Sequence, residues 1–296
     1  MPLILPIQLP ARQTLLSEGL ALHAPGEGLP VGMRALRIAI LNLMPNKSQT
    51  EAQLLRLLGG ARWLVEPTFF YPATHRSNFR STPEEHLRAF YRDFPALRGE
   101  DFDGLVVTGA PVEHLPFEAV DYWDELRQIF DWGLEHARAG LHICWGAQAA
   151  LFHRFGVPKH SLPAKMFGVF PHYAQSESPL LRGLDDEIMI PHSRHTEVRA
   201  EEIAPVPGLQ ILLSSPQAGV HLVTSHGGRQ AYLTGHGEYD PLTLNNEYRR
   251  DLAKGLPIAM PKNYYPDDDP NQPPRVRWRA NARILFANWL EMAAAG

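Results

Sequence analysis

A single cysteine, Cys144, stands where the sequence predicts that a strand gives way to a helix. The apolar run over residues 140–143 ends at the sulfur, and Gly146 follows two residues later, where a helical pattern begins. A sharp strand-to-helix turn of this kind, called a nucleophile elbow, holds the side chain at the edge of a sheet. The helix N-terminus beneath the sulfur favours a thiolate. A lone cysteine is otherwise often only a small buried hydrophobic residue.

Strand and helix patterns alternate through the first half of the chain. Such alternation predicts an α/β fold with a mostly parallel sheet, right-handed crossovers and helices on both faces, and its ligands bind beyond the carboxyl ends of the strands. Ser48 with Glu51, and Thr82 before Pro83, read as helix start signals. Strands are predicted at residues 36–43, 64–71, 102–109 and up to Cys144, and helices at residues 48–58, 82–94, 122–138 and 145–155.

The second half of the chain predicts shorter strands and an irregular end. Residues 1–34 are rich in proline and glycine and predict an extension that wraps the core. Neither a repeat nor a clear linker interrupts the chain, so residues 1–296 are expected to form one catalytic domain. Strands are predicted at residues 188–191, 209–214, 220–224 and 230–235, helices at residues 242–254 and 280–292, and a proline-rich loop at residues 261–274.

Composition excludes several classes of protein. The 28 basic and 32 acidic residues nearly cancel, so neither nucleic acid nor an anionic membrane is an expected partner. One cysteine excludes an internal disulfide and a thiolate metal cluster, as expected in the reducing cytoplasm. The first ten residues lack a basic segment and are broken by prolines, unlike a signal peptide, and no apolar run reaches the roughly 20 residues that span a bilayer.

A cysteine nucleophile needs a base, and the base needs a group that fixes its tautomer. His236 and Glu238 follow directly after a predicted strand and are two residues apart, so in extended backbone their side chains point the same way. The carboxylate can then accept a proton from one ring nitrogen while the other nitrogen faces Cys144. A metal site built from these histidines is the rival interpretation, but the spacing supplies no third ligand.

Acyl chemistry also needs hydrogen-bond donors for a developing oxyanion. The backbone amide of Trp145, directly after the nucleophile, is one candidate donor. The second is expected from the turn over residues 109–112, such as the amide of Ala110, if its strand neighbours the elbow strand. An ordinary turn at the end of a strand explains this segment equally well on sequence alone.

Several long motifs have no general structural reason to occur in one chain. They are NLMP at residues 42–45, TEAQLLRLL at 50–58, STPEEHL at 81–87, FDGLVVTGAP at 102–111, CWGAQAAL at 144–151, PHSR at 191–194, GHGEYD at 235–240 and NY at 263–264. Through these motifs the chain resembles, over its whole length, the homoserine O-acyltransferases of methionine biosynthesis. The resemblance is to the type with an elbow cysteine, which has the class I glutamine amidotransferase (flavodoxin-like) architecture, and not to the α/β-hydrolase type.

The resemblance implies a role for each matching residue. Cys144 matches the cysteine that becomes acylated, His236 the general base and Glu238 the carboxylate that supports it. Lys165 and Ser193 match residues that contact the substrate, although a surface lysine and a turn serine are the plain alternatives. Glu247 and Arg250 match positions that hold the amino and carboxylate groups of homoserine. They lie three residues apart on one helix, where they could also form only a surface ion pair.

Glu113 bears on the acyl donor. Family members that use succinyl-CoA resemble this segment but carry glycine there, whereas those that use acetyl-CoA carry glutamate. A carboxylate in the acyl pocket would repel the free carboxylate of a succinyl group, whereas an acetyl group still fits. An exposed loop glutamate is the plain alternative.

The resemblance therefore implies a homoserine O-acetyltransferase with acetyl-CoA as co-substrate, L-homoserine as acceptor and no cofactor or metal. A homodimer in the cytoplasm is expected from the family. A homoserine O-succinyltransferase that uses succinyl-CoA is the first alternative. The second is the glutaminase subunit of an amidotransferase, which shares the elbow and the His-x-Glu pair but not the other motifs.

Overall fold

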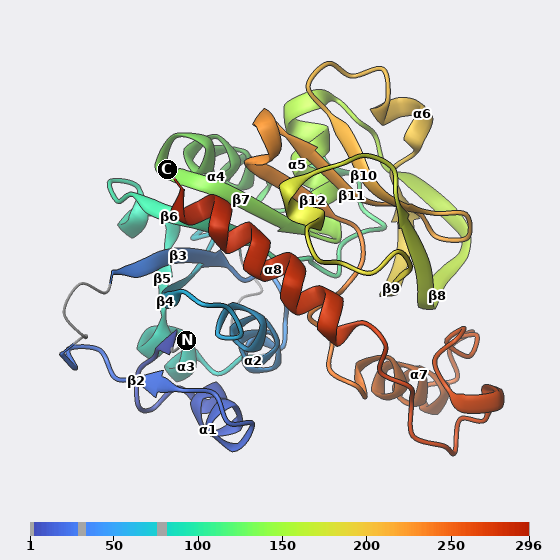
Figure 1. Cartoon of the computed structure of the whole chain (residues 1–296), viewed down its shortest axis with the longest axis horizontal. Coiled ribbons are helices and arrows are strands. Elements are labelled where there is room, and N and C mark those ends of the chain that lie inside the picture. Colours follow the sequence, from blue (N-terminus) through green and yellow to red (C-terminus); the bar gives the residue numbers. More distant parts are fainter. Residues whose placement is uncertain (1–2, 29–33, 76–81, 296) are drawn as a thin grey trace.

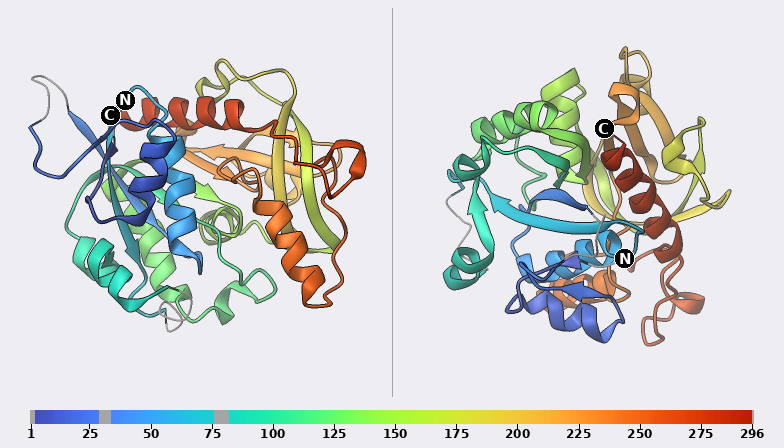
Figure 2. Two further views of the ribbon diagram at one scale, coloured as in Figure 1. Left: turned by 90° about the horizontal axis from the view of Figure 1, so that it is seen from below. Right: turned by 60° about the vertical axis from the view of Figure 1, so that its left-hand side comes forward.

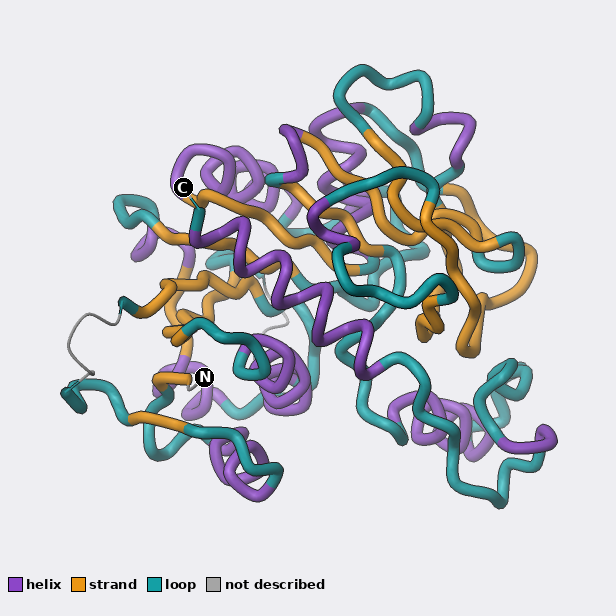
Figure 3. Tube along the Cα trace, in the orientation of Figure 1, coloured by secondary structure: helices purple, strands orange, loops and turns teal. Residues whose placement is uncertain are grey.

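A computed structural model describes residues 3–28, 34–75 and 82–295 (Figure 1). Ser81 of the STPEEHL motif and residues 1–2 and 29–33 of the expected extension lie outside this part of the chain. Within it, eleven strands form one continuous sheet in the order β2-β1-β4-β3-β6-β7-β12-β11-β10-β8-β9, and β5 pairs with β4. Figure 3 shows the strands crossing the middle of the molecule with helices on either side.

The parallel half of the sheet holds the strands that the sequence predicts. β3 (Ala35–Leu41) lies between β4 (Leu64–Tyr71) and β6 (Phe102–Val107), and β6 pairs with β7 (Ala137–Ile143), all in parallel register. These strands are almost entirely apolar because helices cover both faces of the sheet. The carboxyl ends of β6 and β7 therefore meet at one edge, and Cys144 follows directly after β7.

The antiparallel half extends the sheet beyond the elbow strand. β12 (Gln230–Leu233) runs parallel to β7 and antiparallel to β11 (Gly219–Ser225), which pairs with β10 (Gln210–Ser215). β8 (His160–Ala174) and β9 (Ile188–Glu197) form a long antiparallel hairpin attached to β10. The loop after β12 thus emerges beside Cys144, and the hairpin lies next to it.

Helices cover the two faces with separate apolar layers. One layer lies under α2 (Lys47–Leu58) and α8 (Arg279–Ala294), and it includes Leu54, Leu285 and Trp289. The other lies under α4 (Trp123–His136) and α5 (Trp145–Phe155). Figure 2 shows α8 running along one side of the sheet. The fold is the mostly parallel α/β arrangement that the sequence predicts, which is confirmed.

The other elements lie at the periphery. The N-terminal segment is more than a wrapping extension, because two of its strands join the sheet. β1 (Leu3–Ile4) pairs with β4 on one side and with β2 (Leu22–His23) on the other, and α1 (Pro10–Ser17) connects β1 to β2 in the chain. No helix of the described residues is both long and apolar enough to cross a bilayer. The remaining elements are α3 (Glu84–Phe90), β5 (Tyr91–Asp93), α6 (Ala200–Ile203), α7 (Thr243–Ala253) and the 3-10 turns η1 (Phe94–Leu97), η2 (Phe117–Ala119), η3 (Pro179–Leu181), η4 (His226–Gly228) and η5 (Pro266–Asp268).

Two predicted helix starts were wrong. Asn46, and not Ser48, caps α2, because its side chain accepts a hydrogen bond from the amide of Gln49. Thr82 does not cap α3, since its hydroxyl donates to the carbonyl of Pro45. The predicted helix to residue 94 ends at Phe90 because the chain then enters β5, which pairs with β4.

The contact of α8 with β6 gives a direct test of the packing. A methyl group at Gly104 would lie 2.7 Å from Cη2 of Trp289, which is fully buried, so Gly104→Ala forces the ring or the helix to move. Overpacking of this kind costs about 1–3 kcal/mol, and we expect that loss in the free energy of unfolding measured with urea. Gly99→Ala is the control, since no atom lies within 4 Å of the added methyl group. Equal stability of the two variants would contradict this packing.

Candidate active site

Cys144 occupies a strained turn between β7 and α5. Its φ of 52° and ψ of −119° lie outside the regions that residues with a Cβ ordinarily adopt, a conformation that costs about 1–3 kcal/mol and clusters at functional sites. The Cys144 amide donates to the carbonyl of Leu233 at 2.6 Å, which fixes the elbow to β12. Cys144 is also the N-cap residue of α5, so the positive end of the helix dipole lies at the sulfur.

The turn after β6 lies against the nucleophile. A Cβ at Gly109 would be 3.2 Å from the Cβ of Cys144, and one at Gly146 would be 2.5 Å from the carbonyl oxygen of Thr108. Only glycine allows these close approaches, which bring the first turn of α5 against the end of β6. The expected oxyanion donors, the amides of Trp145 and Ala110, therefore belong to two segments that flank the same sulfur.

His236 stands between Glu238 and Cys144. Its Nδ1 lies 2.6 Å from Oε1 of Glu238, and both side chains are buried. Because Nδ1 is engaged, Nε2 is the nitrogen left to face Cys144, whose charge acts on the imidazole. Burial alone would lower the pKa of His236, but the charges of Glu238 and Cys144 and their hydrogen bonds raise it well above its usual value.

Contacts with an aromatic ring and with α2 hold the loop that carries the base. The ring of Tyr239 stacks on His236, with centroids 4.1 Å apart and planes 13° apart. Asp240 accepts hydrogen bonds from Gln53 at 3.1 Å and from Arg56 at 2.7 Å, both on α2. These contacts hold the segment that follows the His-x-Glu pair against the imidazole and against α2.

Glu247 gathers the residues that the sequence assigns to substrate binding. Its Oε1 lies 2.6 Å from Nζ of Lys165 on β8, and its Oε2 accepts a hydrogen bond from Ser193 on β9 at 2.8 Å. Arg250 lies one turn along α7, 3.6 Å from the same carboxylate, and its Nε contacts Asp251. An amino acid carries an ammonium and a carboxylate group. The Glu247 carboxylate complements the first, and the two cations beside it complement the second.

Glu113 is anchored and is not a free loop residue. Its Oε2 accepts a hydrogen bond from the backbone amide of His195 at 2.8 Å, and Lys159 donates to its backbone carbonyl. The hydrogen bond places Glu113 against β9, and its charge acts on Tyr239 and on Arg194.

These groups together can perform acyl transfer. The sulfur can attack a carbonyl carbon, the imidazole can accept and return a proton, and flanking amides can receive negative charge on oxygen. A small cavity beside His236 is also lined by Gly109, Thr108 and Tyr239.

Comparison with known proteins assigns the family. The model of the homoserine O-succinyltransferase family matches residues 2–295. The chain belongs to this family. It is 53% identical over 291 residues to a homoserine O-acetyltransferase of Acetivibrio thermocellus, covering 98% of this chain and 95% of that one. A homoserine O-acetyltransferase of Desulfitobacterium hafniense is 53% identical, with coverage of 98% and 94%. The resemblance expected from the sequence motifs is confirmed.

Solved structures show the same fold at low sequence identity. A glutamine amidotransferase of Thermotoga maritima is 13% identical, with a TM-score of 0.56, and the match covers 89% of this chain and all of that one. A glutamine amidotransferase of Methylobacillus flagellatus has a TM-score of 0.55 at 14% identity, covering 88% of this chain and 96% of that one. These matches establish the amidotransferase-like fold of this family member.

The structure pairs His236 with Glu238, places Trp145 and the turn at Gly109 beside Cys144, and gathers Lys165, Ser193 and Arg250 around Glu247. Two groups near them were missed by sequence reasoning. One is the set Glu113, His114 and His195, whose possible metal-ligating atoms lie within 4.8 Å of one another. Its histidine rings are 4.7 Å apart, and nothing in the spacing of two distant segments indicates this meeting.

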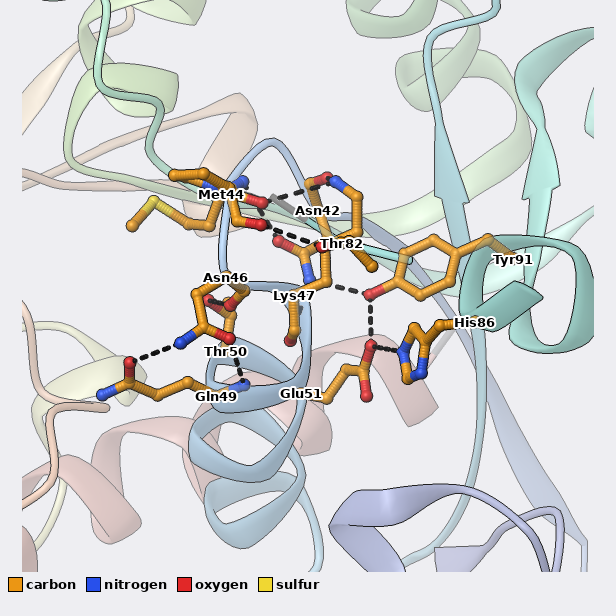
Figure 4. Close-up of polar contacts among 11 residues, drawn as sticks. Asn42, Met44, Asn46, Lys47, Gln49, Thr50, Glu51, Thr82, His86 and Tyr91 are labelled. Carbon is orange, nitrogen blue, oxygen red and sulfur yellow. Dashed lines mark hydrogen bonds and ion pairs between the residues drawn. The ribbon is translucent and has the colours of Figure 1, made fainter. Parts of the chain in front are cut away.

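The second missed group is a buried polar cluster under the turn at residues 42–46 (Figure 4). Nζ of Lys47 donates to the carbonyl of Asn42 at 2.7 Å, and Lys47 is only 2% exposed. Glu51, fully buried, accepts hydrogen bonds from the hydroxyl of Tyr91 and from His86, both at 2.7 Å. The amide of Leu43 donates to the hydroxyl of Thr108 at 2.8 Å, so this cluster supports the turn that flanks Cys144.

Lys47 should make the free energy of unfolding depend on pH in the alkaline range. Burial lowers its pKa from 10.5 to about 8, against the opposing charge of Glu51. Between these values the unfolded chain keeps a proton that the folded chain has lost, so stability rises with pH over this interval. We therefore expect the free energy of unfolding of the wild type, relative to that of Lys47→Met, to rise by about 1.4 kcal/mol for each pH unit between pH 8 and 10.5.

Urea unfolding of both proteins at several pH values measures this gain. The intrinsic cost of the substitution does not depend on pH, so only the slope of the stability difference matters. A flat difference across the interval would contradict the lowered pKa of the buried Lys47.

Proposed function

We propose that this protein is a homoserine O-acetyltransferase, which transfers an acetyl group from acetyl-CoA to the hydroxyl of L-homoserine. The observation that carries the proposal is the elbow cysteine Cys144 together with the buried, hydrogen-bonded pair His236 and Glu238 in a member of this family. The named acetyltransferases at 53% identity over nearly the whole chain support acetyl as the group transferred. The product would be O-acetyl-L-homoserine, an intermediate of methionine biosynthesis.

The first half-reaction loads the enzyme. The sulfur of Cys144 attacks the carbonyl carbon of acetyl-CoA, and the resulting oxyanion lies between the amides of Trp145 and Ala110. The bond between that carbon and the CoA sulfur breaks, and CoA leaves with a proton from His236. One thioester replaces another, so this exchange is nearly balanced in free energy, which favours sulfur as the nucleophile.

The second half-reaction transfers the acetyl group to homoserine. Glu247 receives the ammonium group, Arg250 and Lys165 face the carboxylate, and Ser193 orients Glu247 through its hydrogen bond. His236 takes the proton of the substrate hydroxyl, whose oxygen attacks the acetyl-cysteine. The thiolate leaves, and Glu238 stabilises the imidazolium that returns to the resting state.

The covalent route can be tested without homoserine. Incubation with acetyl-CoA alone should add one acetyl group to the wild type, and intact mass with peptide mapping should locate it on Cys144. Cys144→Ala should show no adduct and lose at least about 10³-fold in kcat, since the nucleophile is gone. Full turnover by Cys144→Ala, or release of ammonia from glutamine without CoA, would contradict the proposal.

The choice of acetyl over succinyl rests on Glu113. The family model is described for succinyl transfer, whereas the similar relatives named above are acetyltransferases. The hydrogen bond from the amide of His195 holds the Glu113 carboxylate in place, which would oppose the entry of a second carboxylate. Repulsion and lost space would act against succinyl-CoA and leave acetyl-CoA unaffected.

Glu113→Gly tests this choice. Removal of the carboxylate should raise kcat/KM for succinyl-CoA relative to acetyl-CoA by at least about tenfold, the equivalent of about 1.4 kcal/mol. Glu118→Gly, at an exposed position in η2 nearby, is a control that should leave the ratio unchanged. An unchanged donor ratio in Glu113→Gly would remove Glu113 from the specificity argument. The cytoplasmic location and the homodimer stay predictions.

A further inference from the structure

The Pro191–Arg194 segment of β9 lies directly beneath the loop that carries His236. The carbonyl of Pro191 accepts a hydrogen bond from the amide of His236 at 2.8 Å. A Cβ at Gly235 would lie 2.8 Å from Nε2 of His192, so loop and strand are in close contact. The role proposed for Ser193 does not account for its neighbours His192 and Arg194, which are both buried.

The hydrogen bonds of His172 and His192 are those of uncharged imidazole rings. Nδ1 of His172 donates to the carbonyl of Phe170 at 2.9 Å, so its Nε2 is free to accept a hydrogen bond from Nε2 of His192 at 3.1 Å. Nδ1 of His192 then accepts from Nε of Arg194 at 3.3 Å. Burial lowers the pKa of His172 to about 4 and that of His192 well below its usual value. Neither histidine therefore carries a charge at neutral pH.

Arg194 is a buried cation beside these histidines, and the groups that accept its hydrogen bonds are neutral. Besides His192 it donates to the carbonyls of Thr196 at 2.6 Å and Ala218 at 2.5 Å, and it is 1% exposed. No carboxylate of the described chain forms an ion pair with it. A buried cation without an anionic partner is costly, so negative charge nearby is stabilised.

The charge of Cys144 is among those that act on Arg194. Burial lowers the pKa of Arg194, and the charges of Cys144, Glu197 and Glu113, in that order, oppose this effect. A chain of hydrogen bonds also joins the two sites. Thr196 donates to the side chain of Gln148 at 2.8 Å, and the amide of Gln148 donates to the carbonyl of Cys144 at 3.1 Å.

Other charged or titratable groups also face Cys144. His236 and Tyr239 approach from the loop after β12, with Glu238 behind the imidazole. Glu113, in the turn after β6, carries a negative charge that acts on Tyr239 and Arg194. The buried His221 lies behind Gly235, whose amide donates to its Nδ1 at 3.1 Å, and burial keeps it neutral by lowering its pKa. Arg194 is therefore the permanent cation of this set.

We propose that Arg194 is a positioning residue for the nucleophile, whose buried charge, held by neutral acceptors, stabilises Cys144 as a thiolate. The inference rests on the proposed role of Cys144 in catalysis and explains why β9 carries an arginine where no carboxylate meets it. The same charge favours the oxyanion formed when the thiolate attacks a thioester.

The single cysteine makes the test direct, because alkylation by iodoacetamide reports on Cys144 alone. In Arg194→Met the pH midpoint of the alkylation rate should rise by about one unit, which lowers the rate at acidic pH about tenfold. Arg194→Gln, whose amide can still donate to the carbonyls of Thr196 and Ala218, should show the same shift. Arg194→Lys keeps the charge and should restore most of the midpoint.

Arg154 offers a matched control at the far end of α5. It also donates only to neutral acceptors, at 2.8 Å to Gln230, 3.0 Å to Tyr232 and 2.8 Å to the carbonyl of Phe130. Arg154→Met should lower stability and leave the alkylation midpoint in place. The inference would be overturned if folded Arg194→Met or Arg194→Gln kept the alkylation midpoint of the wild type. It would also be overturned if Arg154→Met shifted the midpoint by the same amount.

The alkylation test does not depend on turnover. If acetyl-CoA fails to load Cys144 but the midpoint still shifts, the proposed reaction is wrong and the role of Arg194 stands. If acetyl-CoA loads Cys144 but the midpoint does not move, the role of Arg194 is wrong and the proposed reaction stands.

Discussion

The strained backbone of Cys144 is the constraint on which the rest of the site depends. A residue with φ of 52° persists only where its surroundings determine it, and here three segments do so. β12 accepts the amide of Cys144, the turn after β6 lies against its Cβ, and α5 starts at once with Gly146 against Thr108. The sulfur is thereby held at the carboxyl edge of the sheet and at a helix N-terminus, and every other group approaches it from there.

The site joins the two halves of the sheet. The parallel half supplies the nucleophile and the flanking amides, whereas the antiparallel half supplies the base, its carboxylate and the β8–β9 hairpin. Helix α2 links them, because Lys47 and Asn42 support the turn beside Thr108 while Gln53 and Arg56 hold Asp240. Most of these contacts are buried polar ones, which are costly when incomplete, so the arrangement tolerates little displacement.

The parallel half of the fold was readable from the sequence because its strands are continuous apolar runs and its helices are amphipathic. β8 was missed. Over its 15 residues, Pro163, Gly168 and Pro171 interrupt the pattern, and none of its first seven residues is buried. It becomes a strand because β9 pairs with it and β10 adds to its other end. The true cap of α2, Asn46, was missed because Ser48 and Glu51 offered a plausible pair, whereas the carboxylate of Glu51 is taken by Tyr91 and His86.

The sequence by itself determined the family, the elbow and the chemical types of the site residues, because motifs and strand-to-helix patterns are local. Only the tertiary structure decided which charges meet. The contacts of Glu247 with Lys165 and Ser193, the anchoring of Glu113 and the buried cation at Arg194 all join segments far apart in the chain or depend on burial. The electrostatic strength of a group is set by the water removed around it and by its partners, and neither quantity is written in the spacing of residues.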